Sequence, residues 1–228
     1  MNGDPISGAL ITFAGKLYCL TLPNLTMRPG ILSWFYPSLL WKQPCMDAVY
    51  LTFDDGPHPT ITPWVLEQLK AYEAQATFFC VGDNVRKYPE VFETVKAAGH
   101  VTGNHTQHHL NGWKTEDEAY LTDIEAAAAY IGSPLFRPPY GRVTFSQLKL
   151  IREQHPDMQI VMWSLLTCDF DPELLPEECT EQTLRRIRPG DIVVFHDSEK
   201  AFPRLQSVLP AVLEHCRAKG WQMKAISL

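Results

Sequence analysis

The stretch from Ala48 to Pro59, AVYLTFDDGPHP, constrains the fold more than any other part of the chain. Its apolar run of β-branched and aromatic residues ends in Asp54 and Asp55, and a glycine and a proline then turn the backbone. This pattern predicts a short buried strand over residues 49–53. Successive side chains of a strand point to opposite sides. The two aspartates can therefore do different work at one strand end, although Asp-Gly-Pro is also ordinary turn chemistry.

Segments typical of strands and helices alternate along the rest of the chain. Short apolar runs predict further strands at residues 76–81, 100–102, 159–165, 191–195 and 221–226. Apolar residues at helical spacing predict helices at residues 61–72, 88–98, 115–131, 144–154, 181–187 and 205–216. Such alternation is typical of parallel strands joined by crossover helices. The chain is therefore expected to form an α/β fold.

Composition narrows the class of protein. The chain has 228 residues, of which 45% are hydrophobic, so it can bury the core of one large domain. Its net charge of −6 and thinly spread basic residues argue against a nucleic-acid surface, and no apolar run predicts a membrane span. The six cysteines form no CxxC pair and are interpreted as mostly free, buried thiols, which is typical of intracellular proteins.

The first 45 residues differ from the rest. Residues 1–45 contain prolines and glycines without a clear period, and are predicted to form an irregular extension on a main domain of residues 46–228. The apolar, aromatic stretch 31–41 is expected to pack on that domain, with a lipid- or partner-facing patch as the alternative. The chain starts without a basic region, and Lys16 interrupts its apolar stretch. No signal peptide is predicted, and the cytoplasm is favoured over the cell envelope.

Polar residues follow apolar runs at five places. They are Asp54 with Asp55, the segment His105–His109, the segment Arg137–Gly141, Asp169, and His196 with Asp197. In α/β barrels and open parallel sheets, functional sites gather at the carboxyl ends of the strands. Five such coincidences predict one site at this end of the sheet.

The histidine-rich segment suggests a metal site. His105 and His109 are four residues apart, so one helical turn would place both on one face, while His108 would point elsewhere. Two imidazoles and one carboxylate, with an open position for water, form a familiar catalytic zinc arrangement. Asp55 is the expected third ligand. Taken alone, the segment is also consistent with a solvated surface turn.

Two further residues can complete such a site. Arg137 offers a two-pronged donor for a carboxylate, between prolines that fix the backbone, although it could equally be a solvent-exposed arginine in a rigid connector. His196 ends an apolar strand, where a histidine is commonly a hydrogen-bonded structural residue. It becomes a candidate proton donor if the strand ends beside the metal.

Together these motifs resemble the polysaccharide deacetylase family, also called carbohydrate esterase family four. Thr52–Pro57 (TFDDGP) resembles its first motif, and His105–His109 (HTQHH) resembles its second. Arg137–Tyr140 (RPPY) is similar to the third motif, and Val194–His196 (VFH) is similar to the fifth, which usually begins with leucine. The resemblance extends from about Val49 to the C-terminus.

The resemblance implies a fold and a set of roles. The fold is a distorted (β/α) barrel of about seven parallel strands with outer helices, holding a divalent metal, usually Zn²⁺, at its mouth. Asp55, His105 and His109 would be metal ligands, Asp54 the general base with Arg137 as its partner, and His196 the general acid. Tyr140 would lend its backbone N–H to the developing oxyanion, and Phe170 and Val194 would line the acetyl pocket.

The fourth motif departs from the family pattern, which usually reads Asp, two free residues, Asp, Trp. Counting back from Asp169, the leading aspartate is Leu166 here, and the tryptophan is Phe170. That aspartate typically orients and charges the acid histidine. Ser164, Asp169 and Asp197 are the candidates to replace it.

The predicted activity is metal-dependent hydrolysis of acetyl groups on an N-acetylglucosamine-containing glycan, such as peptidoglycan or chitin oligomers. Two alternatives stay open at this point. One is a metal-dependent amidase or hydrolase acting on a non-glycan substrate, and a two-histidine-one-carboxylate triad also suits non-haem iron. The other is a catalytically impaired, glycan-binding pseudo-deacetylase.

Overall fold

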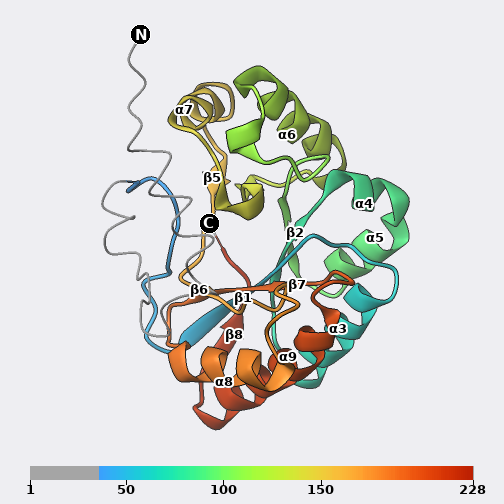
Figure 1. Ribbon diagram of the computed structural model, residues 1–228, viewed down its shortest axis with the longest axis vertical. Helices are drawn as coiled ribbons and strands as arrows, with labels where there is room; N and C mark the ends of the chain where they lie inside the picture. Colours follow the sequence, from blue (N-terminus) through green and yellow to red (C-terminus); the bar gives the residue numbers. More distant parts are fainter. Residues whose placement is uncertain (1–35, 228) are drawn as a thin grey trace.

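A parallel β-sheet forms the centre of the protein in the computed structural model, which describes residues 36–227 (Figure 1). Its strands are β1 (Ala48–Asp54), β2 (Thr77–Cys80), β3 (Val101–Asn104), β4 (Leu135–Phe136), β5 (Gln159–Ile160), β6 (Leu165–Leu166), β7 (Ile192–His196) and β8 (Gln222–Lys224). Their order is β5-β4-β3-β2-β1-β7-β6, and β8 pairs with the start of β1. All of these pairings are parallel. The predicted distorted barrel of about seven parallel strands is confirmed.

Helices surround the curled sheet (Figure 1). They are α3 (Ile61–Ala71), α4 (Gly82–Lys87), α5 (Pro89–Ala97), α6 (Asp117–Ile131), α7 (Phe145–Gln154), α8 (Pro176–Arg186) and α9 (Phe202–Ala218), with short 3₁₀ turns at η1 (Gly112–Lys114) and η2 (Pro139–Gly141). The predicted helices are all present. The helix predicted at 181–187 begins earlier because Pro176 lies in its first turn, a position that suits proline.

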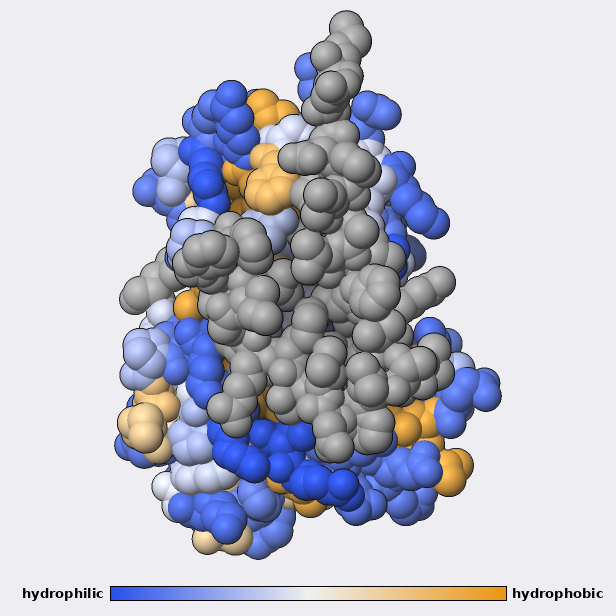
Figure 2. Space-filling model, turned by 60° about the vertical axis from the view of Figure 1, so that its left-hand side comes forward, coloured by the Kyte–Doolittle hydropathy of each residue, from blue (hydrophilic) through white to orange (hydrophobic). Residues whose placement is uncertain are grey.

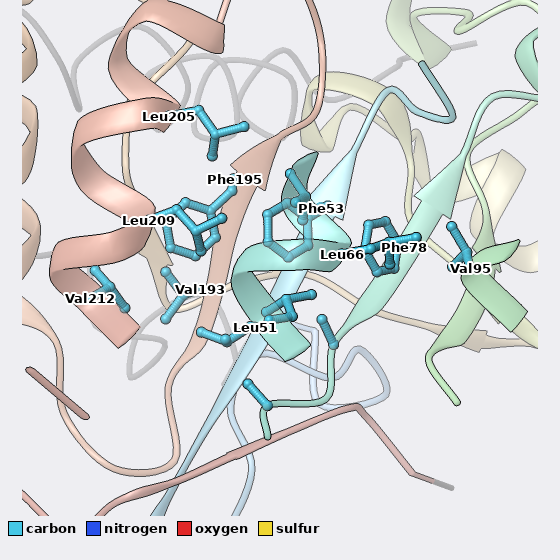
Figure 3. Close-up of a cluster of buried hydrophobic side chains, with 14 of the residues drawn as sticks. Leu51, Phe53, Leu66, Phe78, Val95, Val193, Phe195, Leu205, Leu209 and Val212 are labelled. Carbon is cyan, nitrogen blue, oxygen red and sulfur yellow. The ribbon is translucent and has the colours of Figure 1, made fainter. Parts of the chain in front are cut away.

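Strand β1 is the best-buried element of the sheet, since all seven of its residues are buried. Phe53 stacks between Phe78 of β2 and Phe195 of β7, with ring centroids 4.9 and 5.4 Å apart (Figure 3). Leucine and valine side chains from α3, α5 and α9 close over these rings. Each such side chain contributes about 1.5–3 kcal/mol by leaving water. This core fixes the position of the β1 end, which carries Asp54.

One predicted strand, residues 159–165, is wrong as a single element. The structure places β5 and β6 at opposite ends of the sheet order, so the chain crosses between them at residues 161–164. The carbonyls of Val161 and Met162 accept hydrogen bonds from the side chain of Arg137. An apolar run alone does not reveal that a side chain, and not a neighbouring strand, satisfies these carbonyls. The two-residue strand β4 and the short helix α4 were not predicted.

The described part of the N-terminal region, residues 36–45, packs on the body. Tyr36 stacks on Phe145 of α7 at 5.0 Å, and Leu40 forms a parallel bridge with Val161. Residues 36–41 of the stretch 31–41 thus contact the main body, whereas residues 1–35 lie outside the described part of the chain and the packing of the whole extension stays a prediction. The boundary between residues 45 and 46 stays a prediction.

The described surface is largely hydrophilic, and four of the cysteines expected to be free are free thiols. Hydrophilic residues cover much of the described surface in Figure 2, with small apolar patches between them. Among residues 36–227, no helix is long and apolar enough to cross a bilayer. Cys80, Cys179 and Cys216 are buried free thiols, and Cys45 is a partly buried one.

Candidate functional site

The end of β1 carries a buried ion pair. Asp54 Oδ1 lies 2.6 Å from Arg137 Nη1, and both side chains are almost completely buried. Arg137 also donates to the hydroxyl of Thr52 and to the carbonyls of residues 161 and 162, and its guanidinium stacks 4.1 Å from the ring centroid of Phe79. A buried arginine with this many acceptors is held in one orientation. Asp54 therefore has one oxygen fixed and the other, Oδ2, facing His105 Nε2 at 4.0 Å.

The turn after Asp54 depends on its glycine. Asp55 has a left-handed backbone (φ 82°), and its carbonyl accepts a hydrogen bond from the side chain of Asn84 at 2.7 Å. A Cβ atom at Gly56 would lie 2.2 Å from Asp197 Oδ2. The Gly56 N–H donates to Asp197 Oδ1 at 3.1 Å, so only glycine fits here. From this turn Asp55 Oδ1 reaches to 3.9 Å from His105 Nε2, the same nitrogen that Asp54 Oδ2 faces.

Asp55, His105 and His109 meet at one point. One ligand atom from each lies within 4.8 Å of those from the other two. Asp55 Oδ1 is 3.2 Å from His109 Nε2 and 3.9 Å from His105 Nε2. His105 Nδ1 lies 2.7 Å from the carbonyl oxygen of Arg137 and donates to it, which leaves the Nε2 lone pair free. Two imidazole nitrogens and a carboxylate oxygen in this arrangement fit a zinc ion with an open fourth position.

The charge states of these three residues also suit a cation. Burial lowers the pKa of His105 to about 4, so its imidazole is neutral near neutral pH. Burial opposes ionisation of Asp55, but the hydrogen bond from His109 and the nearby histidine charges hold its pKa below its usual range. A neutral imidazole and an ionised carboxylate are the forms that bind metals.

The loop that carries the two histidines is held by residues that the sequence analysis missed. Thr106 and His109 both have left-handed backbones, with φ of 62° and 56°. Asn104 accepts from the Thr106 N–H at 2.8 Å, and the buried Asp123 of α6 accepts from the His108 N–H at 3.0 Å. The His108 ring also turns to Asp123, away from the triad, as predicted. Asn104 directly precedes the motif, whereas no sequence signal identifies Asp123.

His196 lies beside Asp54, because the register of β1 and β7 pairs these two residues, and both line the pocket with the triad. Its Nδ1 is 2.7 Å from Asp169 Oδ1, and its backbone N–H donates to Asp169 Oδ2 at 2.8 Å. Burial disfavours the charged ring, but the charge and hydrogen bond of Asp169 outweigh that effect and raise the pKa of His196 to about 9. His196 is therefore protonated near neutral pH.

The structure distinguishes the three candidates for the partner of His196. Ser164 bonds to Asp191, and Asp197 bonds to Gly56 and Thr62, so only Asp169 contacts the histidine ring. The backbone carbonyl of Asp169 in turn accepts from Arg204 Nε of α9 at 2.6 Å. Arg204 is buried and was not identified from the sequence, where it is one more arginine on a helix.

A pocket of about 450 Å³ opens over these groups. Its wall includes the three predicted substrate contacts, Tyr140, Phe170 and Val194, and also Leu166. The ring of Tyr140 lies 4.6 Å from that of His109, and the ring of Phe170 lies 5.1 Å from that of His196. Among residues 36–227 the Tyr140 N–H has no hydrogen-bond acceptor, so it is available to a ligand. Eight of the nine predicted site residues therefore line one pocket, and the ninth, Arg137, is buried behind Asp54.

The family model for polysaccharide deacetylase matches residues 42–156. The chain belongs to the polysaccharide deacetylase family. It is 32% identical to a peptidoglycan-N-acetylglucosamine deacetylase of Bacillus cereus, over 82% of this chain and 90% of that protein. It is also 32% identical to a chitooligosaccharide deacetylase of Azorhizobium caulinodans, over 66% of this chain and 73% of that protein.

A solved structure of the family has the same fold. The Bc1960 peptidoglycan N-acetylglucosamine deacetylase, crystallised with a naphthyl-substituted N-oxidanyl-benzamide, aligns with a TM-score of 0.79 and 29% identity. The alignment covers 85% of this chain and 94% of that one. In this polysaccharide deacetylase all five motifs contribute residues to the pocket wall, and Asp169 of the fourth motif contacts the histidine.

Proposed function

We propose that this polysaccharide deacetylase removes acetyl groups from N-acetylglucosamine residues of a glycan. Asp55, His105 and His109 would hold a divalent metal, which we propose is zinc. When bound there, the ion would supply an activated water and polarise the acetyl carbonyl. The observation that carries the proposal is that Asp54 and His196 line the same pocket as this triad, each oriented by its own buried partner.

Asp54 would act as the general base. Its Oδ1 is held by Arg137, whereas Oδ2 faces the triad and can accept the proton of the attacking water. The oxyanion that develops on the acetyl carbonyl would receive the N–H of Tyr140, which has no other acceptor among the described residues. The Asp54 carboxylate and the Tyr140 N–H are both in position before substrate binds, which reduces the reorganisation that the reaction needs.

His196 would act as the general acid. Its pKa of about 9 keeps it protonated at neutral pH, so it can donate a proton to the departing amine nitrogen. Asp169 would hold the ring so that the proton of Nε2 faces the pocket. The apolar side chains of Phe170 and Val194 would surround the acetyl methyl group. The products would be acetate and a free amino sugar.

Acetate release from oligomers of N-acetylglucosamine by the zinc-loaded protein tests this function. Wild-type protein is expected to release acetate, and Asp54→Asn is expected to keep its zinc while turnover falls by roughly 10²–10⁴-fold, as for the loss of a general base. Zinc content measured on both proteins controls for loss of the metal. Full activity of Asp54→Asn would remove the assigned base. A zinc-loaded wild type that releases no acetate from any N-acetylated sugar would indicate a binding protein or a different substrate.

A further inference from the structure

Two similar groups of side chains flank the pocket. In the first, which we call the Tyr140 arm, the Tyr140 ring lies against His109, and the guanidinium of Arg142 is 5.8 Å from the centre of the Tyr140 ring. In the second, the Phe170 arm, the Phe170 ring lies against His196, and Lys200 Nζ is 5.8 Å from the centre of the Phe170 ring. Each arm therefore runs from a histidine of the site through an aromatic ring to a cation at the pocket wall.

Neither cation is neutralised by the described part of the chain. Within residues 36–227, Arg142 and Lys200 form no ion pair with a carboxylate, and their contacts to other side chains are with aromatic rings. Other exposed cations do have acidic partners, for example Lys96 with Glu93 and Arg185 with Glu181. Two unpaired cations at one pocket of a chain with a net charge of −6 create a local field that attracts anions.

The Arg142 side chain contacts two rings. Its guanidinium lies 5.8 Å from the centre of the Tyr140 ring and 5.2 Å from that of Trp113, and the Arg142 N–H donates to the Pro139 carbonyl at 3.0 Å. A cation stacked on aromatic rings has lost part of its freedom before a ligand arrives.

The Phe170 arm is fixed through α9. Arg204 donates to the carbonyl of Lys200 and to the carbonyl of Asp169, the residue that holds His196. The backbone of Lys200 is therefore tied to the same segment as the proposed general acid. The backbone segments that carry the two cations are therefore tied to the site, and both side chains line the pocket.

We propose that Arg142 and Lys200 bind carboxylates on the sugars that flank the acetylated residue. This inference rests on the proposed deacetylase function. The exposed ring of Tyr140 and the ring of Phe170 offer apolar faces to sugar rings, and each cation lies just beyond its ring. A carboxylate at that position can pair with the guanidinium or the ammonium group. The substrate is therefore an anionic N-acetylglucosamine glycan of the peptidoglycan type, and not a neutral chitin oligomer.

The test compares one glycan in two charge states. Acetate release by the zinc-loaded protein is measured on a soluble peptidoglycan fragment with free carboxylates, and on the same fragment with its carboxylates converted to amides. We expect kcat/KM to be about 10-fold higher for the free carboxylates at low salt, and this preference to shrink as salt screens the exposed charges. In the double variant R142Q/K200Q the ratio of the two kcat/KM values is expected to fall from about 10 to about 1. Each single variant is expected to lower this ratio by about threefold.

A matched control and a second readout keep the outcomes distinct. Lys87→Gln removes an exposed lysine of α4 outside the pocket and is expected to keep the full preference. Affinities of zinc-loaded Asp54→Asn for the two fragments, measured by calorimetry, test the same charge preference without turnover. If Asp54→Asn binds the charged fragment more tightly but the zinc-loaded wild type releases no acetate from either fragment, the deacetylase function is refuted and the anion site is supported. Equal kcat/KM and equal affinity for both fragments would overturn the anion site while leaving deacetylation intact.

Discussion

The two sides of the pocket hold their functional residues in different ways. On the β1–β3–β4 side, Arg137, Asp54 and His105 are bound to one another, and all belong to motifs that were recognisable in the sequence. On the β6–β7 side, His196 is held by Asp169, while Leu166 occupies the place of the usual partner. An orienting carboxylate needs only an oxygen at about 2.7 Å from Nδ1, and residues at more than one position can supply it. On the second side, the positions of the side chains therefore identify the partner of His196 better than the sequence motif does.

Removing a ligand on the first side is expected to have the largest effect. His109→Ala leaves two of the three candidate ligands, so zinc content should fall to background and acetate release should fall about a thousandfold or more, since a bound metal supplies several kcal/mol of transition-state stabilisation. Metal analysis after dialysis and acetate release are the measurements. His108→Ala is the matched control, because His108 faces Asp123 and not the triad, and it should keep its zinc. Undiminished zinc in His109→Ala would place the metal elsewhere.

Asp169→Asn tests the second side and is expected to lower kcat by roughly 10²-fold, within the range for loss of acid catalysis. The carboxylate accepts from both the ring and the backbone N–H of His196, and an amide has only one oxygen to serve them. The anion also raises the pKa of His196 to about 9. Without it that pKa falls, the histidine loses its proton at lower pH, and the basic limb of the pH–rate profile moves to lower pH.

The pH profile separates this role from a merely structural one. Ser164→Ala, at the residue that bonds to Asp191, should leave the basic limb where it is in the wild type. An Asp169→Asn protein whose basic limb does not move would show that another group sets the protonation of His196.

Leu166→Asp restores the usual family residue and is expected to have the smallest effect. Asp169 already occupies His196 Nδ1, so kcat should stay within about twofold of the wild type. A carboxylate at the apolar pocket wall should raise KM by about 3–10-fold, because Leu166 lies opposite Val194 there. Leu166→Met, which conserves volume, is the control for packing. An increase in kcat above tenfold would mean that Asp169 replaces the family aspartate only poorly.

Much of the fold and most of the candidate site could be predicted from local patterns. Strand β1 was evident because its apolar run ends in a sharp turn, and the residues assigned to the site do converge on one pocket. The choice among Ser164, Asp169 and Asp197 could not be made, because it depends on how β6 and β7 align and on the left-handed backbone of Cys168 just before Asp169. Non-local register and single-residue backbone conformations leave little trace in residue order.

The residues that support the site were the hardest to foresee. Asp123 and Arg204 lie on helices, outside every motif that was recognisable in the sequence, and act on backbone groups of the site loops. A hydrogen bond to a backbone group places no demand on the type of the residue that contributes that group, so no pairing pattern appears in the sequence. Such residues become visible only when the loops and helices are placed together.

The crossing of the chain between β5 and β6 has a consequence for how this protein can be altered. Arg137 ties the buried carbonyls of that crossing to the carboxylate of Asp54, so one guanidinium both closes the gap between β5 and β6 and orients the proposed base. A substitution of Arg137 is therefore expected to change both the stability of this crossing and the orientation of Asp54. A screen for folded variants and a screen for active variants should both recover only arginine at position 137.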